Sequence, residues 1–226
     1  MVNKFEPPRL TPIGDSALLL TLSDAIDLEI NQQICSLDHQ LKTQPVDGIL
    51  EWVPGYSSLT VFYDPMTIDL AEVKSHVLAC LSESEQQITP PPKQITIPVI
   101  YGGEGGPDLA WLAEFQCISP AEVIRLHTAP TYRVGMMGFT PGFAYLIGLD
   151  PALATPRRET PRTRVPAGSV GIAGHQTGIY PLDSPGGWQL IGKTDSVLFD
   201  PQREQPFLLS PGDEVRFQDR AEGVRP

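Results

Sequence analysis

Residues 138–194 read GFTPGFAYLIGLDPALATPRRETPRTRVPAGSVGIAGHQTGIYPLDSPGGWQLIGKT, and this stretch of sequence decides the fold. It holds ten glycines and seven prolines, yet it is neither repetitive nor poor in apolar residues, so disorder is not indicated. Glycine is required where φ is positive or another group comes close, and proline presets turns. We therefore predict a backbone that is fixed at many special positions.

The C-terminal half favours a small β-barrel or sandwich, because short β-prone segments alternate with Gly/Pro turns from Tyr132 onward. The expected strands are Ile95–Tyr101, Tyr132–Met137, Ser169–Ala173, Gly187–Ile191, Ser196–Phe199 and Glu214–Phe217. One helix is expected over Pro107–Phe115, and another at Ser119, which opens a capping box with Glu122. The segment from Asp150 to Val165 is expected to be an irregular loop, which is unusual unless it is functional.

The N-terminal half predicts a separate α+β domain. Strands are expected over Ala17–Leu22 and Ser57–Tyr63, and helices over Leu28–Leu41 and Leu70–Leu81, where apolar residues recur at helical spacing. Three consecutive prolines at 90–92 predict a stiff linker. We expect an N-terminal domain over residues 1–88, a linker over 89–94 and a mainly-β domain over 95–226.

The charge of the chain is negative and unevenly distributed. The net charge is −11; residues 1–94 carry 5 basic and 13 acidic side chains, whereas residues 95–226 carry 11 and 14. Ten of the eleven arginines lie in the second part. A nucleic acid or an acidic membrane is therefore not an expected partner, since phosphate contacts need basic surface. Any anion chemistry is expected in the C-terminal half.

The remaining composition points to a cytoplasmic protein. No run approaches about 18 uncharged apolar residues, and the N-terminus lacks the order of a signal peptide. Cys35, Cys80 and Cys117 are widely separated, and we expect reduced structural thiols. The four histidines show no ligand spacing with one another or with the cysteines, so no metal site is predicted.

Two groups of polar residues are candidates for a binding site. Arginines crowd at 157, 158, 162 and 164, with Glu159 as the only acid among them. They are either solvated loop charges or a site for a carboxylate or phosphate. His175 is followed by Gln176 in an expected turn, and it is either structural or part of a site. Lys193 is a candidate substrate-facing cation.

Three motif matches are interpreted as structure. The segment 187–194 fits the P-loop pattern G-x-x-x-x-G-K-[ST], but its interior is strand-like and no helix start follows, so the match is interpreted as accidental. Residues 167–171 approximate the nucleophile elbow G-x-S-x-G, and we expect a strand entered through a turn instead. The glycine-rich loop 102–106 is interpreted as a hinge or partner contact rather than a phosphate cradle.

At these residues the chain becomes recognisable. The segments GFTPGFAYLIGLDP, PRRETPRTRVPAGSVGIAG, QTGIYP and SPGGWQLIGKT resemble the family of the 5-oxoprolinase B subunit, which is also called the KipI or allophanate hydrolase subunit 1 family. VPGYSSLTVFYDP, YGGEGGPDL and EVIRLH fit too, so the resemblance covers nearly the whole chain. The chain departs from the family pattern at Gly105, where a bulky residue is common, and at Lys193, where Arg is common.

The resemblance implies a fold and an activity. The fold is an α+β N-terminal domain followed by a mainly-β cyclophilin-like barrel domain. The activity is that of a bacterial ATP-dependent 5-oxoprolinase, which hydrolyses 5-oxo-L-proline to L-glutamate. The implied partners are the A subunit of 5-oxoprolinase and a sister cyclophilin-like protein, its C subunit. This chain alone is expected to hold no cofactor and to be inactive without its partners, while the complex uses ATP.

A shared site is expected to bind the substrate carboxylate or a phosphorylated intermediate. Its candidate residues on this chain are Arg162, Arg164, His175, Gln176, Tyr180 and Lys193. Two alternatives stay open: a regulatory inhibitor of a sensor histidine kinase, as in KipI, and an allophanate hydrolase or urea carboxylase-type subunit. The same motifs serve all three, and the sequence does not separate them.

Overall fold

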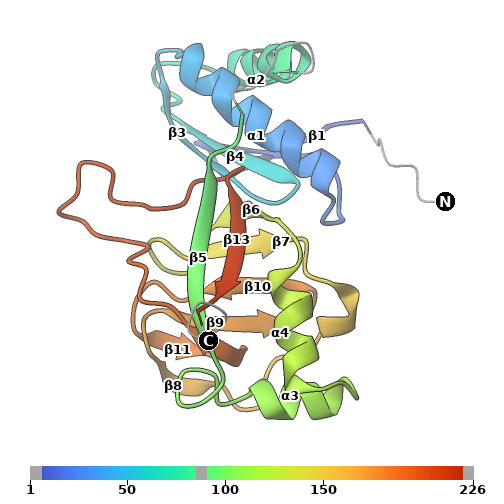
Figure 1. The fold of residues 1–226 in the computed structure, drawn as a ribbon. Coiled ribbons are helices and arrows are strands. Elements are labelled where there is room, and N and C mark those ends of the chain that lie inside the picture. The colour runs from blue at the N-terminus through green and yellow to red at the C-terminus, as the bar shows by residue number, and fades with distance from the viewer. Residues whose placement is uncertain (1–6, 85–90, 221–226) are drawn as a thin grey trace. The chain divides into compact units, whose positions relative to one another are not determined.

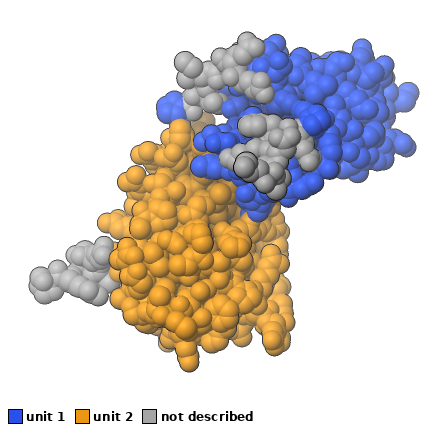
Figure 2. All heavy atoms as spheres, turned by 90° about the vertical axis from the view of Figure 1, so that its right-hand side faces the viewer, with its two compact units in different colours: residues 1–91 blue, residues 92–226 orange. Residues whose placement is uncertain are grey.

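The computed structural model of the chain describes residues 7–84 and 91–220. Contacts divide the chain into two compact units, residues 1–91 and 92–226, which Figure 2 colours separately. Part of the predicted linker, residues 89 and 90, lies outside the described residues. Within the described ranges, no helix is both long and apolar enough to cross a bilayer.

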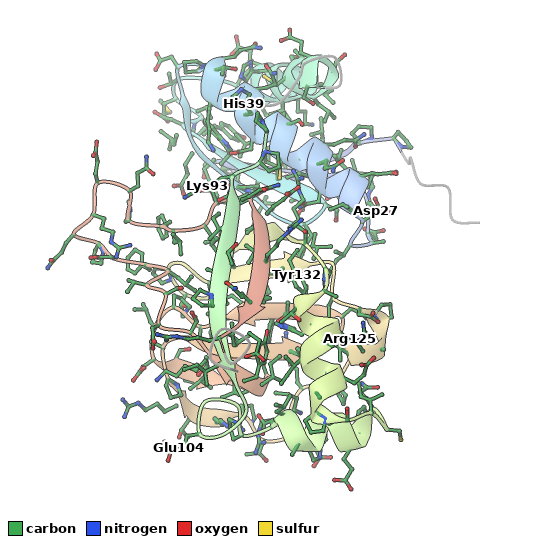
Figure 3. The ribbon with its side chains drawn as sticks, in the orientation of Figure 1. Asp27, His39, Lys93, Glu104, Arg125 and Tyr132 are labelled. Carbon is green, nitrogen blue, oxygen red and sulfur yellow. The ribbon has the colours of Figure 1, made fainter. Side chains whose placement is uncertain are left out.

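The first unit is an antiparallel sheet with strand order β1-β2-β4-β3, and two helices pack on it (Figure 1). Its elements are β1 (Arg9–Ile13), β2 (Ala17–Thr21), α1 (Leu28–Thr43), β3 (Ile49–Pro54), β4 (Ser58–Tyr63) and α2 (Leu70–Ser84). Asp27 caps α1 by accepting the Glu29 N–H at 2.8 Å, at the helix end labelled in Figure 3. Alternate residues of β2 and β4 are buried against the helices, which gives this unit its own core.

The helices and inner strands of the first unit confirm the prediction, with small shifts at their ends. Strands β1 and β3 were not predicted. Both lie at edges of the sheet, where a strand buries little and shows no clear apolar alternation. Each also contains a proline, Pro12 or Pro54, which edge strands tolerate and central strands do not.

The second unit is a closed seven-stranded barrel with strand order β10-β7-β6-β13-β5-β12-β9. Its strands are β5 (Gln94–Tyr101), β6 (Tyr132–Met137), β7 (Ala144–Ile147), β9 (Ser169–Ala173), β10 (Gln176–Ile179), β12 (Gln189–Lys193) and β13 (Glu214–Asp219). Strand β13 runs parallel to β5, and the other neighbouring pairs are antiparallel. Closure leaves no free edge in the barrel.

Two helices pack beside the barrel, α3 (Leu109–Phe115) and α4 (Pro120–Thr128) (Figure 1). The predicted cap of α4 is confirmed, because the Ser119 hydroxyl accepts the Glu122 N–H at 3.1 Å. The Glu122 carboxylate forms a bidentate pair with Arg125 on the next turn.

Several predictions for the second unit need correction. The expected strand Ser196–Phe199 is wrong: only an isolated bridge between Phe199 and Phe207 forms there. The expected irregular loop after Asp150 contains a short 3-10 helix, η1 (Pro151–Leu153), and ends in strand β8 (Arg162–Val165). Strand β8 pairs with β11 (Ser184–Gly186) to form a separate two-stranded ribbon. Strand β12 begins two residues later than the predicted strand.

One chain of polar groups crosses the core of the barrel unit. The His127 ring is fully buried, with Nδ1 2.7 Å from the Tyr101 hydroxyl and Nε2 2.9 Å from Thr177 Oγ1. Because Thr177 donates its only proton to the Gly171 carbonyl at 3.0 Å, its oxygen accepts from Nε2–H, and Nδ1 accepts from Tyr101. Burial lowers the pKa of His127 to about 3, so the ring is neutral.

Candidate functional site

Three of the six predicted site residues line one pocket on the barrel unit. This cationic pocket, about 480 Å³ in volume, is lined by Ile100, Glu104, Gly105, Pro107, Arg162, Arg164, Pro166, Ser169, Leu190, Lys193 and Asp195. Glu104 lies on the loop that follows β5, as labelled in Figure 3. Strand β8 supplies both arginines, and the last residue of β12 supplies Lys193.

Arg162 is held by a buried carboxylate. Asp108 is 8% exposed at its side chain, and its two oxygens each lie 2.7 Å from Arg162 Nη2. The same carboxylate pairs with Arg158 at 3.2 Å and accepts the Leu190 N–H at 2.7 Å. Arg162 also donates to the Trp188 carbonyl at 3.3 Å. Asp108 thus ties β8 and the segment before it to β12, and the Arg162 charge is largely neutralised.

Arg164 has an exposed partner. Its guanidinium pairs with Asp183 at 2.6 Å, and both side chains are largely in water. The pKa of Asp183 lies below its usual value, first because it accepts the Ala167 N–H and second because it faces Arg164. The arginine cluster is therefore not short of acids. Its acids, Asp108 and Asp183, come from distant parts of the sequence.

Lys193 is the cation of this pocket with the fewest constraints. Among the residues that the structure describes, it forms no ion pair within 4.0 Å. A Cβ built on Gly105 would lie 2.8 Å from the Lys193 Cβ, so the two departures from the family pattern are neighbours in space. A bulky residue at 105 would displace Lys193. The glycine therefore fits the lysine that accompanies it.

Tyr180 belongs to a second pocket. This aromatic pocket, about 310 Å³ in volume, is lined by Phe139, Phe143, Tyr145, Arg157, Arg158, Pro161, Tyr180, Pro185, Gly186, Gly187 and Trp188. Tyr180 is 2% exposed, and burial raises its pKa, so its hydroxyl stays protonated. The two pockets adjoin at the start of β8, where Pro161 lines one and Arg162 lines the other.

His175 and Gln176 line neither pocket. His175 is exposed in the turn between β9 and β10, and Gln176 is the half-buried first residue of β10. Gly174, just before them, has φ +57° and open space around it, so the turn itself explains this glycine. The structure therefore divides the six predicted residues among three places.

Two of the three motif matches adopt the structures that the sequence favoured, and the hinge or partner contact expected for the third, the loop 102–106, stays a prediction. The P-loop match contains strand β12, and irregular chain rather than a helix follows it. Ser169 is buried at the start of β9. The chain enters this strand through a turn in which the Ser169 N–H donates to the Pro166 carbonyl. The loop 102–106 packs against β12: Gly102 N–H donates to the Ile191 carbonyl, and a side chain at Gly106 would meet that same carbonyl.

Residues that were not predicted build much of the site. They are Asp108, which holds two arginines, and the four aromatic residues Phe139, Phe143, Tyr145 and Trp188, whose rings line the aromatic pocket. A signal was present in the sequence, because aromatic residues accompany the glycines of residues 138–194. Within the described residues, no group of three His, Cys, Asp or Glu side chains could hold a metal ion.

The sequence of this barrel-containing chain matches a family of carboxyltransferase domains. Residues 8–209 match the family model described as "Carboxyltransferase domain, subdomain C and D". The chain is 43% identical to the 5-oxoprolinase B subunit of Bacillus subtilis (strain 168), covering 92% of this chain and 91% of that one. It is 45% identical to the same subunit of Escherichia coli O157:H7, and the match covers 94% of this chain and 96% of that one. The chain therefore belongs to the family of the 5-oxoprolinase B subunit.

A solved structure supports the same fold. The crystal structure of TTHA0988 superposes with a TM-score of 0.80 at 40% identity and covers 90% of this chain. This chain spans 39% of the length of TTHA0988, which is a longer protein.

Proposed function

We propose that the chain is a subunit of an ATP-dependent 5-oxoprolinase complex that hydrolyses 5-oxo-L-proline to L-glutamate. The observation that carries the proposal is the 43–46% identity to the 5-oxoprolinase B subunit of three bacteria, over 91–96% of their lengths. The A and C subunits of 5-oxoprolinase are the proposed partners, and the cytoplasm is the proposed location. ATP is used by the complex, and this chain holds no cofactor of its own.

The chemistry explains why such a complex needs ATP and cations. Amide resonance makes the lactam of 5-oxoproline unreactive, so its oxygen must be activated before water attacks. ATP supplies that activation on another subunit. Positive charges and amide N–H groups placed near the developing negative charge lower the barrier. On this chain, the cationic pocket supplies such charge and binds an anionic group of the substrate or of its phosphorylated intermediate.

The six candidate residues take different roles in this proposal. Lys193 contacts the anion, because it is the pocket cation without an ion pair in the described residues. Arg162 and Arg164 position the pocket, each through its own acid. Tyr180 acts from the aromatic pocket. His175 and Gln176 lie on a turn and contribute only if that turn is covered by a partner subunit.

The domain assignment is part of the proposal. We assign an N-terminal domain to residues 1–88, a linker to 89–94 and a cyclophilin-like barrel domain to 95–226. The closed barrel and the division into two compact units support this assignment.

The test is reconstitution. The chain is co-purified with the candidate A and C subunits, and ATP hydrolysis that depends on 5-oxo-L-proline is measured with and without it. We expect activity to be lost when the chain is omitted and restored when it is added back. Unchanged activity without the chain contradicts the enzyme-subunit proposal. The match to a carboxyltransferase domain family keeps an allophanate or urea pathway as a second candidate, and release of ammonia from allophanate by the same complex tests it.

A further inference from the structure

The aromatic pocket lies over a small hydrophobic cluster of its own, separate from the main core of the barrel unit. Phe143, Tyr180 and Trp188 form its buried floor, with the Phe143 ring centroid 5.2 Å from Tyr180 and 5.4 Å from Trp188. Tyr145 lies 4.7 Å from Phe143 and is only half-buried. Aromatic pairs at these distances and steep angles are stable by themselves. The volume of about 310 Å³ is at the lower end of ligand pockets, which suits a small molecule.

The residue at the pocket edge is held in a strained conformation. Phe139 has φ +71°, a region that side-chain-bearing residues rarely adopt, and the residue is 61% exposed. The turn that contains it is closed by hydrogen bonds from Phe143 N to Thr140 O and from Gly138 N to Phe143 O. The ring stands edge-on to Phe143 and to Tyr180. A large apolar ring kept in water by a strained backbone indicates that a ligand covers it.

Glycines shape the floor of the pocket. A Cβ at Gly178 would lie 3.2 Å from both Phe143 and Trp188, and one at Gly171 would lie 3.1 Å from Trp188. A Cβ at Gly186 would collide with the Tyr180 ring and hydroxyl. The rings sit directly on glycine backbone, so their positions are fixed before any ligand arrives.

The charges around the pocket select an anion. Its lining contains two arginines and no Asp or Glu. Arg158 is paired with Asp108, whereas Arg157 forms no hydrogen bond or ion pair in the part of the chain that the structure describes. Aromatic cages commonly take cations, but a guanidinium beside the rings repels them. A planar guanidinium also matches a carboxylate in a two-point contact.

We propose that the aromatic pocket binds a small ring that carries a carboxylate, with the ring against the aromatic floor and the carboxylate on Arg157. Resting on the proposed function, the inference names 5-oxo-L-proline as that ligand. Tyr145 and Tyr180 place phenol hydroxyls in the same lining, which is where the lactam group of this ligand would lie. Since the pockets adjoin at the start of β8, the cationic pocket is left for the phosphorylated group.

The test uses the reconstituted complex and two variants of the pocket edge, Arg157→Gln and Phe139→Ala. We expect each to raise the KM for 5-oxo-L-proline at least tenfold and to leave the KM for ATP within twofold. Arg157→Lys should recover part of the loss. Arg203→Gln is the matched control, because Arg203 lies on another loop and pairs with Asp200. Wild-type KM values in both pocket variants overturn the proposal.

Ligand selectivity gives a readout that a structural role would not change. Cyclopentanecarboxylate should compete with 5-oxo-L-proline, whereas 2-pyrrolidinone, the same lactam without the carboxylate, should not. In Arg157→Gln this difference should disappear. Equal competition by the two compounds in the wild type contradicts an arginine–carboxylate contact. If the variants bind the other subunits too weakly to co-purify, yet show an unchanged KM when the subunits are mixed in excess, the pocket would be a contact for a partner side chain. That result would overturn the proposal.

The two proposals fail separately. If the chain is required for activity but the pocket variants keep the wild-type KM, only the pocket assignment fails. If the chain is dispensable for ATP hydrolysis, the proposed function is contradicted. The pocket assignment is then tested by measuring whether 5-oxo-L-proline binds to the full chain alone. In that case the Trp188 indole N–H resonance of ¹⁵N-labelled chain is followed as 5-oxo-L-proline is added. A shift that Arg157→Gln abolishes supports the pocket, and no shift overturns it.

Discussion

Asp108 is the residue on which the arrangement of the arginine segment depends. Its buried carboxylate accepts from two guanidinium groups and one backbone N–H of β12. A carboxylate at this depth is stable only while those partners remain. The arginines that looked like an open anion site in the sequence are therefore partly a structural device, and the free guanidinium among them is that of Arg157 in the described residues.

Removing the charge of the Asp108 carboxylate should destabilise the protein. We expect Asp108→Asn to lower the free energy of unfolding by about 2–4 kcal/mol, since it leaves the half-buried Arg162 without its counter-charge. Asp183→Asn, which breaks an exposed pair, should lower it much less, because water screens that pair. Chemical denaturation of both variants and the wild type measures the difference. Equal losses would contradict the distinction between the two acids.

His127 should make stability depend on pH. Burial lowers its pKa in the folded protein to about 3, below the ordinary value near 6.5 of the unfolded chain. The contribution of the neutral His127 ring to the free energy of unfolding is therefore complete above about pH 6.5. It declines as the pH falls toward 3, by up to about 1.4 kcal/mol per pH unit. His127→Gln should be less stable than the wild type at pH 7, and the gap should narrow on acidification. A gap that stays constant from pH 7 to pH 4 would contradict this.

At the scale of elements, the glycines of residues 138–194 serve two different needs. Some support positive φ, such as Gly142, Gly148, Gly168 and Gly174. Gly178 has an ordinary φ and instead makes room, because β10 passes directly beneath Phe143 and Trp188. Other groups do lie close to the glycine backbone of this stretch. At Gly178 these groups include aromatic rings of the chain itself.

Gly178→Ala should disturb the packing of β10. Its Cβ would lie 2.8 Å from the Ala144 carbonyl oxygen, which is backbone of the neighbouring strand and cannot rotate away. We expect a loss of about 1–3 kcal/mol in thermal or chemical unfolding, as for other overpacked sites. Gly138→Ala is the control, because nothing lies within 4 Å of its Cβ and its φ is not positive. A similar loss in both variants would mean that the clash is not the cause.

Secondary structure was predictable where one element buries a regular apolar face. Helices α1 and α2 and strand β4 have such faces and lie close to their predicted positions, as do β2, β6 and the fully buried β9. Strands β7, β8, β10 and β11 have three or four residues each and are too short to show a period. Ser196–Phe199 shows the opposite error: the residues favour a strand, but the barrel closes without them.

At the scale of the whole molecule, each unit has its own core. The first is built from β2, β4, α1 and α2, and the second from the barrel strands with α3 and α4. Each therefore has the burial that independent folding requires. We expect residues 1–91 and 92–226, expressed separately, each to unfold cooperatively in denaturant. Circular dichroism and the sharpness of the transition test this, and a fragment without a cooperative transition would contradict the assignment of that unit as a domain.

The sequence by itself determined the family, the helices and longer strands, and the concentration of arginines in the C-terminal half. Those features reside in local periodicity, composition and long motifs. Only the tertiary structure decided which residues share a pocket. Asp108 and Arg162 are 54 positions apart in the sequence, and the ring centroids of Phe139 and Tyr180, also distant in sequence, lie 6.5 Å apart. Barrel closure and strand register bring such groups together, and neither is encoded in the spacing of residues along the chain.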